Sequence, residues 1–414
     1  MRSVLVFFSL AAVGLTGIRS DAAQEAPLRF AFGPGPYPDG VTAVRDTGGY
    51  DAARGFGFEP GADCRISGGA VIGLKPFAFS VRLPEGNHEV TLTLGDDEAD
   101  SVTTVRVEAR RLLVENQQAA KGKAVARRIT VNTRTPVIGA GVSVKLKQRE
   151  RDSETITWDD RLTLEFSGSR PSVRAIDIKP IPGVPTVFIA GDSTVCDQPD
   201  APWSSWGQML PRFLKPGVVV ANYAQSGESL KSSIGARRFE KIFSRMKRGD
   251  TLLLQFGHND MKDKNPDALS TYTETLRKIV TETRAKGGVP VLVTPMERKA
   301  GVKGPTLAGY PDAVRKVARE EKVGLVDLNA ASVRLYLALG ADLGLAFQDG
   351  THHNGYGSYE LAKCVAAGLV SAQPALSAFV ADEARAFRPE RPDPPRAFAL
   401  AAESPPDSAK PDGD

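Results

Sequence analysis

The first half of the chain alternates apolar and polar residues over short stretches, a pattern typical of β-strands with one buried face. The alternating stretches lie at 77–83, 88–94, 103–108, 128–132, 142–146 and 162–166. Turn-forming residues separate them, as in Pro84–Asn87. Repeated short strands with little helical periodicity predict an all-β sandwich over residues 27–180. Two glycine-rich stretches, Phe32–Gly35 and Gly55–Phe58, are expected to form loops packed against it.

The pattern changes after a proline-rich joint at Pro180–Pro185. Strand-like apolar runs then alternate with helical stretches, which indicates a parallel sheet covered on both faces. The predicted strands are 186–190, 218–221, 251–256, 289–294 and 323–328, and the predicted helices are roughly 204–214, 233–247, 267–286, 306–322 and 357–371. The sequence therefore predicts an α/β domain over residues 186–372, with a site beyond the carboxyl ends of its strands.

The two ends of the chain differ from both domains. Residues 1–22 have the layout of a secretory signal peptide, with Arg2 before an apolar run from Val4 to Gly17 and small residues after it. The alternative is a buried N-terminal segment. We expect export to the periplasm or beyond the cell, with no membrane insertion after signal cleavage. Residues 373–414 form a proline-rich tail that is expected to be partly disordered.

Composition excludes several classes of protein. The 414 residues are 41% hydrophobic and 25% charged, as in soluble globular proteins of two or three domains. A net charge of +4, without a basic stripe interleaved with aromatic residues, argues against nucleic-acid binding. Cys64, Cys196 and Cys364 are too few for a disulfide scaffold or a structural zinc site. An exported protein can still join two of them, and the sequence fixes neither that pairing nor the oligomeric state.

Four polar segments that contain glycine each follow the strands of the predicted sheet. They are Gly191–Thr194, Asn222–Ser229, Gly257–Asp260 and Asp349–His352. Because the carboxyl ends of parallel strands meet at one edge, these segments can converge. They supply a serine, an asparagine amide, a backbone N–H at a glycine and an aspartate–histidine pair, which together are the parts of a hydrolase. The serine alone is weak evidence, because serine after a strand also caps helices.

These segments resemble, in order, the conserved blocks of the SGNH (GDSL-like) hydrolases over about residues 186–371. The variants Gly-Asp-Ser-Thr, Gly-His-Asn-Asp and Asp-Gly-Thr-His are similar to the rhamnogalacturonan acetylesterase branch. The resemblance implies a three-layer, flavodoxin-like parallel sheet as the catalytic domain. The preceding sandwich resembles the galactose-binding-like domain of some bacterial pectin-degrading enzymes.

The resemblance also implies roles for individual residues. Ser193 corresponds to the nucleophile, His352 to the general base and Asp349 to the partner of that base. The oxyanion hole corresponds to the backbone N–H groups of Ser193 and Gly227 and to the side-chain amide of Asn259.

Other residues near these segments are weaker candidates. Trp203 and Ser229 are candidate substrate-binding residues, and His353 either lines the pocket or is exposed to solvent. Trp206 lies on an amphipathic helix and is expected in the core. Glu228 stands where the branch often carries arginine, which leaves the identity of the substrate open.

Three other polar residues in these segments can have either a chemical or a structural role. Asp192 is expected to hold the turn that presents Ser193 rather than to act in the chemistry. His258, beside Asn259, is either a second base or a hydrogen-bonded structural residue, and we favour the second. Asp260 is expected to be structural.

Metal and cofactor motifs are absent from the sequence. Gly86–Glu89 matches a short metallophosphoesterase signature, but the other ligand blocks of such a site are missing. The chain has no CxxC pair, no HExxH motif and no phosphate-binding glycine loop. We therefore predict a hydrolase with no metal and no cofactor.

Together with the predicted export, the resemblance implies a secreted carbohydrate esterase. Such an enzyme would remove O-acetyl groups from plant cell-wall polysaccharide, with pectic rhamnogalacturonan as the expected substrate. Alternatives are acetylxylan, another acetylated glycan or a lipid ester as substrate, or a non-catalytic glycan-binding protein. The sequence does not give the acetylated hydroxyl position or the role of the sandwich.

Overall fold

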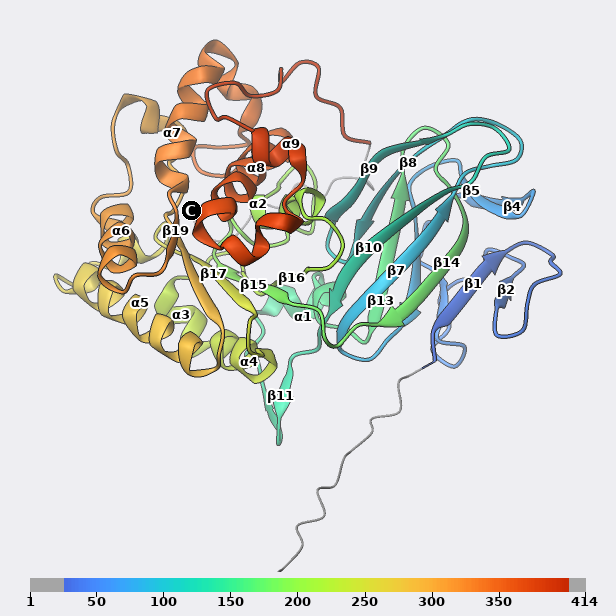
Figure 1. Ribbon diagram of the computed structural model, residues 1–414, viewed down its shortest axis with the longest axis horizontal. Coiled ribbons are helices and arrows are strands. Elements are labelled where there is room, and N and C mark those ends of the chain that lie inside the picture. The colour runs from blue at the N-terminus through green and yellow to red at the C-terminus, as the bar shows by residue number, and fades with distance from the viewer. Residues whose placement is uncertain (1–25, 402–414) are drawn as a thin grey trace, which may run out of the picture.

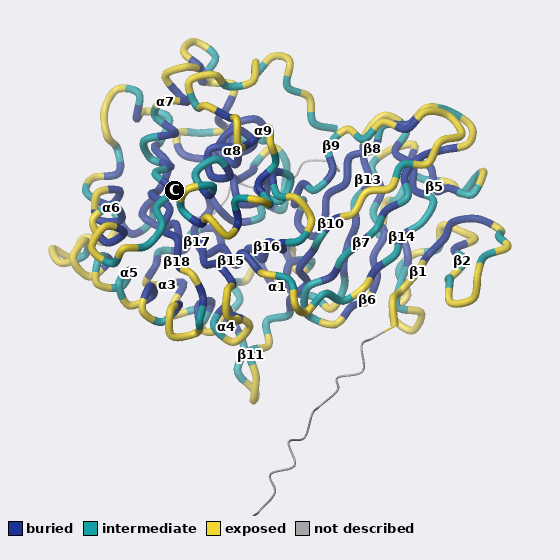
Figure 2. The backbone as a smooth tube through the Cα atoms, in the orientation of Figure 1, coloured by how far each residue is buried: buried dark blue, intermediate teal, exposed yellow. Residues whose placement is uncertain are grey.

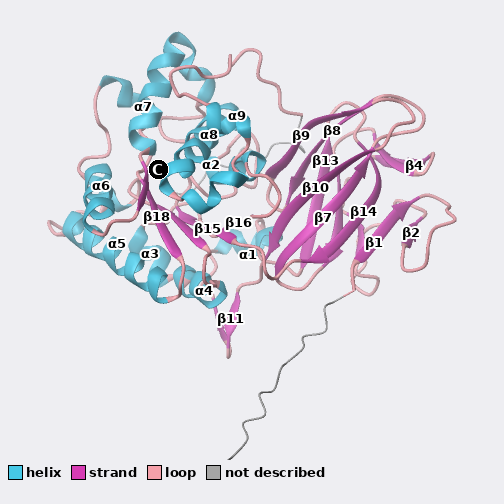
Figure 3. Cartoon of the chain, viewed as in Figure 1, coloured by secondary structure: helices cyan, strands magenta, loops and turns pink. Residues whose placement is uncertain are grey.

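The computed structural model describes residues 26–401, in which an all-β domain lies beside an α/β domain (Figure 1). The predicted fold class is confirmed. Helices gather around the parallel sheet, whereas the first domain is built almost wholly of strands (Figure 3). The predicted signal peptide lies outside the described residues. Within them, no helix combines the length and the apolar character that a membrane crossing requires.

Two sheets face each other in the β domain. The larger has the order β10-β7-β14-β1-β2, and β5 joins it by pairing with β14 and β4. Its strands are β1 (Leu28–Phe32), β2 (Thr42–Val44), β4 (Cys64–Ser67), β5 (Ala70–Gly73), β7 (Gly86–Leu94), β10 (Val125–Thr133) and β14 (Ser172–Pro180). The smaller sheet consists of β3 (Phe56–Phe58), β6 (Phe77–Arg82), β13 (Arg161–Ser167), β8 (Ser101–Val107) and β9 (Arg111–Ala119).

Aromatic side chains fill the space between these two sheets. Phe58 and Phe79 meet edge to face with ring centroids 5.1 Å apart. Residues 55–58, expected as a loop, thus contribute strand β3 to the core. Gly57 explains why the strand fits there, because a Cβ atom at this position would lie 2.4 Å from the carbonyl oxygen of Gly49. The glycine permits the neighbouring backbone to approach closely.

The α/β domain contains a parallel sheet of order β16-β15-β17-β18-β19, the flavodoxin-like order. Its strands are β15 (Thr186–Gly191), β16 (Val219–Asn222), β17 (Thr251–Gln255), β18 (Val289–Val293) and β19 (Gly324–Val326). Val187 and Ile189 pack on one face of the sheet, and Phe188 and Ala190 on the other. Burial on both faces explains the continuous apolar runs in the sequence.

Helices cover the two faces. One face packs against α2 (Trp206–Met209), the 3₁₀-helix η2 (Leu210–Phe213), α7 (Leu328–Leu339) and α8 (Gly355–Ala372). The other packs against α3 (Leu230–Gly235), α4 (Arg238–Arg245), α5 (Ala268–Ala285) and α6 (Tyr310–Glu320).

Residues 134–160 leave the β domain between β10 and β13 and pack on the α/β domain. This 134–160 excursion contains β11 (Val137–Gly139), β12 (Val142–Ser143), α1 (Gln148–Asp152) and the 3₁₀-helix η1 (Thr155–Thr157). In Figure 1, β11 projects beside α4. The stretch 142–146, predicted as a sandwich strand, forms only the short strand β12. Val144 and Trp158 instead belong to the core that covers the parallel sheet.

The two domains share buried contacts at their seam. Leu112 of β9 packs into the core formed by α2 and α8. The Arg111 guanidinium lies 2.9 Å from the Asp197 carboxylate, and both side chains are only 2% exposed. Figure 2 shows dark, buried backbone on both sides of this seam.

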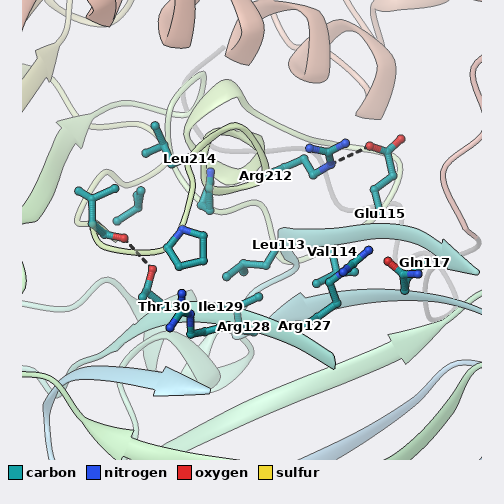
Figure 4. Close-up of a pocket in the computed structure, with 14 residues that line it drawn as sticks. Leu113, Val114, Glu115, Gln117, Arg127, Arg128, Ile129, Thr130, Arg212 and Leu214 are labelled. Carbon is teal, nitrogen blue, oxygen red and sulfur yellow. Dashed lines mark hydrogen bonds and ion pairs between the residues drawn. The ribbon is translucent and has the colours of Figure 1, made fainter. Parts of the chain in front are cut away.

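A groove opens at the outer part of the seam and contains none of the candidate site residues (Figure 4). Two polar contacts between the domains border it. Arg212 Nε lies 2.9 Å from Glu115 Oε2, and the Thr130 hydroxyl donates to the Val218 carbonyl at 2.6 Å. The ion pair and the hydrogen bond thus join the two domains in addition to the buried contacts.

The C-terminal segment returns to the β domain. Residues 374–379 form the 3₁₀-helix η6 (Pro374–Phe379), and α9 (Asp382–Ala386) follows; Val380 and Ala384 are fully buried in the α8 core. The Ala401 carbonyl accepts a hydrogen bond from Arg106 at 3.0 Å. The part of the predicted tail after Ala401 lies outside the described residues.

Candidate active site

The site begins where three neighbouring parallel strands end. Gly191 of β15 pairs with Gln255 of β17, and Ile189 pairs with Asn222 of β16. The segments that follow these strands carry Ser193, Asn259 and Gly227, so they leave the sheet side by side. The break in strand order between β15 and β17 is where doubly wound folds place their ligands.

Ser193, His352 and Asp349 form one hydrogen-bonded chain. His352 Nε2 lies 2.8 Å from Ser193 Oγ, and His352 Nδ1 lies 2.9 Å from Asp349 Oδ2. Ser193 is 3% exposed and His352 is 2% exposed. The distances suit transfer of the serine proton to the imidazole, with the carboxylate holding the ring.

Asp349 also shapes the turn that presents His352. Its Oδ1 accepts the backbone N–H groups of Thr351 at 2.7 Å and of His352 at 2.6 Å. Burial alone would raise the pKa of the Asp349 carboxyl, but these N–H groups and the imidazole hold that pKa well below its ordinary value. The carboxylate is therefore ionised throughout the neutral range. Asn354 ends the turn by capping α8 through the Gly357 N–H at 3.1 Å.

The three candidate oxyanion donors lie on loops that are joined to one another by hydrogen bonds. Gln225 N donates to Gly191 O at 3.1 Å, which joins the loop of Gly227 to the end of β15. Within the described residues, the backbone N–H groups of Ser193 and Gly227 donate no hydrogen bond. The Asn259 amide gives one hydrogen to Glu228 O at 3.0 Å. A second Asn259 hydrogen and the two backbone N–H groups are thus available for an oxyanion.

Trp203 and Ser229 occupy different surroundings. The Trp203 indole meets the His352 ring edge to face, with centroids 5.8 Å apart, and is half-buried. It lies at the reacting histidine, where it can bound the space for a substrate. The Ser229 hydroxyl accepts the Ser232 N–H at 3.1 Å and caps α3.

The structure does not bring His353 to the surface of the site. Its side chain is 3% exposed, with the ring centroid 4.0 Å from that of Phe347. His353 Nε2 lies 2.9 Å from the Tyr336 hydroxyl, which donates to Glu297 O. Neither a place in the pocket nor exposure to solvent, the two positions expected for His353, matches this packing. Trp206 is fully buried, as expected, and its Nε1 donates to Gln255.

Asp192 and His258 form a buried pair behind the nucleophile. Asp192 Oδ1 accepts the Thr194 N–H at 2.9 Å, which stabilises the turn. His258 Nδ1 lies 3.3 Å from Asp192 Oδ2, and His258 Nε2 donates to Met296 O at 3.0 Å. Burial would raise the pKa of Asp192, but His258 and Thr194 lower it below its usual value. Both ring nitrogens of His258 thus face partners other than Ser193.

Asp260 lies on the same side of the site. Its Oδ1 accepts the Leu230 N–H at 2.9 Å and so fixes the start of α3. Burial raises the pKa of Asp260 to about 7. These contacts agree with the structural position expected for this residue.

Glu228 turns into the protein. It is 3% exposed, lies 3.6 Å from Arg238 and 3.8 Å from Lys147, and accepts a hydrogen bond from the Ser232 hydroxyl. Glu228, at the position where the rhamnogalacturonan acetylesterase branch often has arginine, therefore pairs with Arg238 and Lys147 within the protein.

Sequence reasoning missed several residues behind the site. Gln198 Nε2 donates to the Ser193 carbonyl at 2.6 Å, and the Asn222 amide donates to Val195 O at 2.8 Å. Gln225 donates to Glu154 of the 134–160 excursion at 2.9 Å. Asn222 and Gln225 lie in a segment that the sequence singled out, whereas no local motif marks Gln198 or Glu154.

Metal-ligating groups do not gather at the site. Within residues 26–401, no three His, Cys, Asp or Glu side chains lie close enough together to hold an ion. All three cysteines fall within this range, and each is a free thiol. Burial raises the pKa of the Cys196 thiol far above its ordinary value, which favours the protonated thiol over the nucleophilic thiolate near Ser193.

A flavodoxin-like sheet with a linked serine, histidine and aspartate at its carboxyl edge defines a serine hydrolase. Residues 189–358 match the GDSL-like Lipase/Acylhydrolase family, and the chain belongs to this family of ester hydrolases.

Relatives differ in how much of the chain they cover. Rhamnogalacturonan acetylesterase RhgT of Bacillus subtilis (strain 168) is 38% identical over 205 residues, which are 44% of this chain and 88% of that protein. The uncharacterized esterase YxiM of the same organism is 27% identical over 367 residues, or 83% of this chain and 90% of that protein. A crystal structure of YxiM covers 83% of this chain and 98% of its own, with a TM-score of 0.45 and 26% identity.

Proposed function

We propose that the protein removes O-acetyl groups from rhamnogalacturonan through an acetyl-enzyme on Ser193. The hydrogen-bonded chain of Ser193, His352 and Asp349 carries this proposal. The acetyl-polysaccharide assignment is supported by relatives named rhamnogalacturonan acetylesterase, 38% identical in RhgT. A second relative, 32% identical, is named a probable rhamnogalacturonan acetylesterase, YesY.

The first half of the reaction transfers the acetyl group to the protein. Ser193 Oγ attacks the acetyl carbonyl carbon while His352 Nε2 accepts the hydroxyl proton. The carbonyl oxygen becomes an oxyanion, which the N–H groups of Ser193 and Gly227 and the amide of Asn259 stabilise. When the carbon–oxygen bond to the sugar breaks, the sugar oxygen takes the proton from His352.

The second half releases acetate. His352 takes a proton from water, and the resulting hydroxide attacks the acetyl carbon. The same donors stabilise the second oxyanion, and Ser193 Oγ leaves with the proton from His352. The ionised Asp349 stabilises the imidazolium that forms in both halves.

The proposal also includes the location of the protein outside the cytoplasm. The polar and apolar pattern of residues 1–22 supports export of the protein to the periplasm or beyond the cell. Acetylated cell-wall polymers would be met there.

Acetate release from acetylated rhamnogalacturonan tests the function. Wild-type protein should release acetate, and Ser193→Ala should lower the rate about 10⁴-fold or more because the attacking oxygen is gone. Acetylxylan is the parallel substrate. Release from xylan alone would keep the mechanism and change the substrate. An active Ser193→Ala variant, or a folded wild type that hydrolyses no ester, would contradict the proposal.

A further inference from the structure

The loop that carries Gly227 is held from outside its own domain. The Lys147 ammonium donates to the carbonyl oxygen of Ser226, and Gln225 Nε2 donates to Glu154 Oε2 at 2.9 Å. Lys147 and Glu154 belong to the 134–160 excursion of the β domain. The two residues that precede the proposed oxyanion donor are thus tied to a segment that is distant in sequence.

The excursion is itself firmly fixed on the α/β domain. Glu150 of α1 and Arg238 of α4 pair through two hydrogen bonds, at 3.0 and 2.6 Å, and both side chains are buried. The Trp158 indole donates to Glu150 at 2.9 Å. Paired, hydrogen-bonded charges in a dry environment resist rearrangement. Lys147 and Glu154 therefore extend from a rigid base.

A second segment of the β domain supports the loop that follows the nucleophile. Arg110, in the turn between β8 and β9, donates to Gln198 O at 3.1 Å and to Trp203 O at 3.0 Å. Gln198 in turn donates to the carbonyl oxygen of Ser193 at 2.6 Å. The β domain thus reaches both the nucleophile loop and the Gly227 loop.

We propose that Lys147 and Glu154 are positioning residues for the esterase reaction, which makes the β domain a working part of the active site. They hold residues 225–228 so that the Gly227 N–H meets the developing oxyanion. This inference rests on the proposed function, in which that N–H stabilises the transition state. An oxyanion donor acts only at the right distance, and a shift of about 1 Å can cost about a hundredfold in rate.

The first test changes Lys147. Lys147→Met keeps the aliphatic stem but removes the ammonium that contacts Ser226 O. With 4-nitrophenyl acetate, we expect kcat to fall about tenfold while KM changes less than twofold, because an oxyanion donor acts in the transition state. Lys147→Arg should restore most of kcat. Lys145→Met is the matched control, since Lys145 is exposed on the same excursion.

The second test uses the pair of Glu154 and Gln225. Glu154→Ala and Gln225→Ala should each lower kcat about tenfold. The double variant should be no slower than either single variant, because both changes remove the same contact. Labelling of Ser193 by an organophosphonate, which forms a tetrahedral adduct, should slow in parallel with kcat.

The outcomes separate this inference from the proposed function. An inactive wild type, or an active Ser193→Ala, would overturn both. The positioning role alone would be overturned by two results together. The wild type would hydrolyse esters through Ser193, and Lys147→Met and Glu154→Ala would each keep the wild-type kcat when kcat is calculated per Ser193 that the organophosphonate labels. Loss of near-UV circular dichroism would show that a variant of the excursion has lost its tertiary packing. In that case the kcat and KM of Gln225→Ala, a change in the Gly227 loop itself, test the positioning role by the same criteria.

Discussion

Two adjacent histidines show how strongly the surroundings set the role of a residue. His352 faces Ser193 and Asp349, whereas His353 points to the opposite side of the chain, against Phe347 and Tyr336. Burial, with the nearby histidines, lowers the pKa of His353 to about 3. The ring therefore stays neutral and serves as a packed hydrogen-bond donor.

This burial makes a prediction for stability in acid. In the unfolded chain His353 has a pKa of about 6.5, so it binds a proton as the pH falls below that value, whereas the folded protein does not until about pH 3. The contribution of His353 to stability is thus complete above pH 6.5 and is lost as the pH falls. His353→Gln should remove up to about 1.4 kcal/mol per pH unit from the slope between pH 6 and 4.

Urea unfolding at pH 7, 6, 5 and 4 measures both slopes. The urea m-value should be the same in the two proteins, which would show that the unfolded states are comparable. Parallel slopes would mean that His353 titrates equally in the folded and unfolded states.

At the scale of elements, a two-residue period identifies a strand with one buried face but does not say what covers that face. The stretches 88–94 and 162–166 form strands as predicted. The stretch 142–146 has the same pattern, yet its Val144 packs into the other domain. Strand β14 was missed because a bulge between Val173 and Ala175 shifts the alternation.

The candidate site likewise contains residues that the sequence can reveal and residues that it cannot. The residues whose chemistry needs a fixed local spacing, Asp349 and His352, can be found from the sequence because one short turn holds both. Lys147 and Glu154 cannot, because they lie outside the segments that follow the strands of the parallel sheet and contact residues 79 and 71 positions away. Only the folded chain brings such segments together.

Helix α2 provides a prediction at this scale. A Cβ atom at Gly207 would lie 2.1 Å from Val195 O and 2.9 Å from the Asn222 amide, within the turn that follows Ser193. Gly207→Ala should lower the free energy of unfolding by about 1–3 kcal/mol and should also lower kcat, because the turn must move. Urea unfolding and ester hydrolysis measure the two effects.

Gly235 at the end of α3 is the matched control. A Cβ atom there would meet no other atom within 4 Å, so Gly235→Ala should leave kcat unchanged and stabilise by up to about 1 kcal/mol. Equal effects of the two substitutions would show that the contact at Gly207 is unimportant.

At the scale of the whole molecule, the two domains form one structural unit. Leu112, Val144 and Trp158 of the β domain complete the two cores of the α/β domain. Charged side chains are buried at the same seam. Burial raises the pKa of Glu108 to about 8 despite the nearby Arg111, and it lowers the pKa of Arg134.

Breaking a buried ion pair at this seam should be costly. Arg111→Met would leave Asp197 buried without its 2.9 Å partner, and the free energy of unfolding should fall by about 3–5 kcal/mol. Arg111→Met combined with Asp197→Leu should recover part of that loss. Arg277→Met, at the partly exposed pair with Glu320, should have a much smaller effect on urea unfolding, because solvent screens that pair. Equal losses at the two sites would contradict a buried, shared seam.

The excursion between β10 and β13 also bears on how such a protein can change over generations. RhgT aligns over 205 residues, which are 88% of its length and 44% of this chain. In the present protein, deletion of the sandwich would also remove Val144, Glu150 and Trp158 from the catalytic half. Loss of that domain from the gene would therefore open this core and leave the buried Arg238 without the Glu150 carboxylate. The α/β half of this protein therefore depends on the β half for part of its own core.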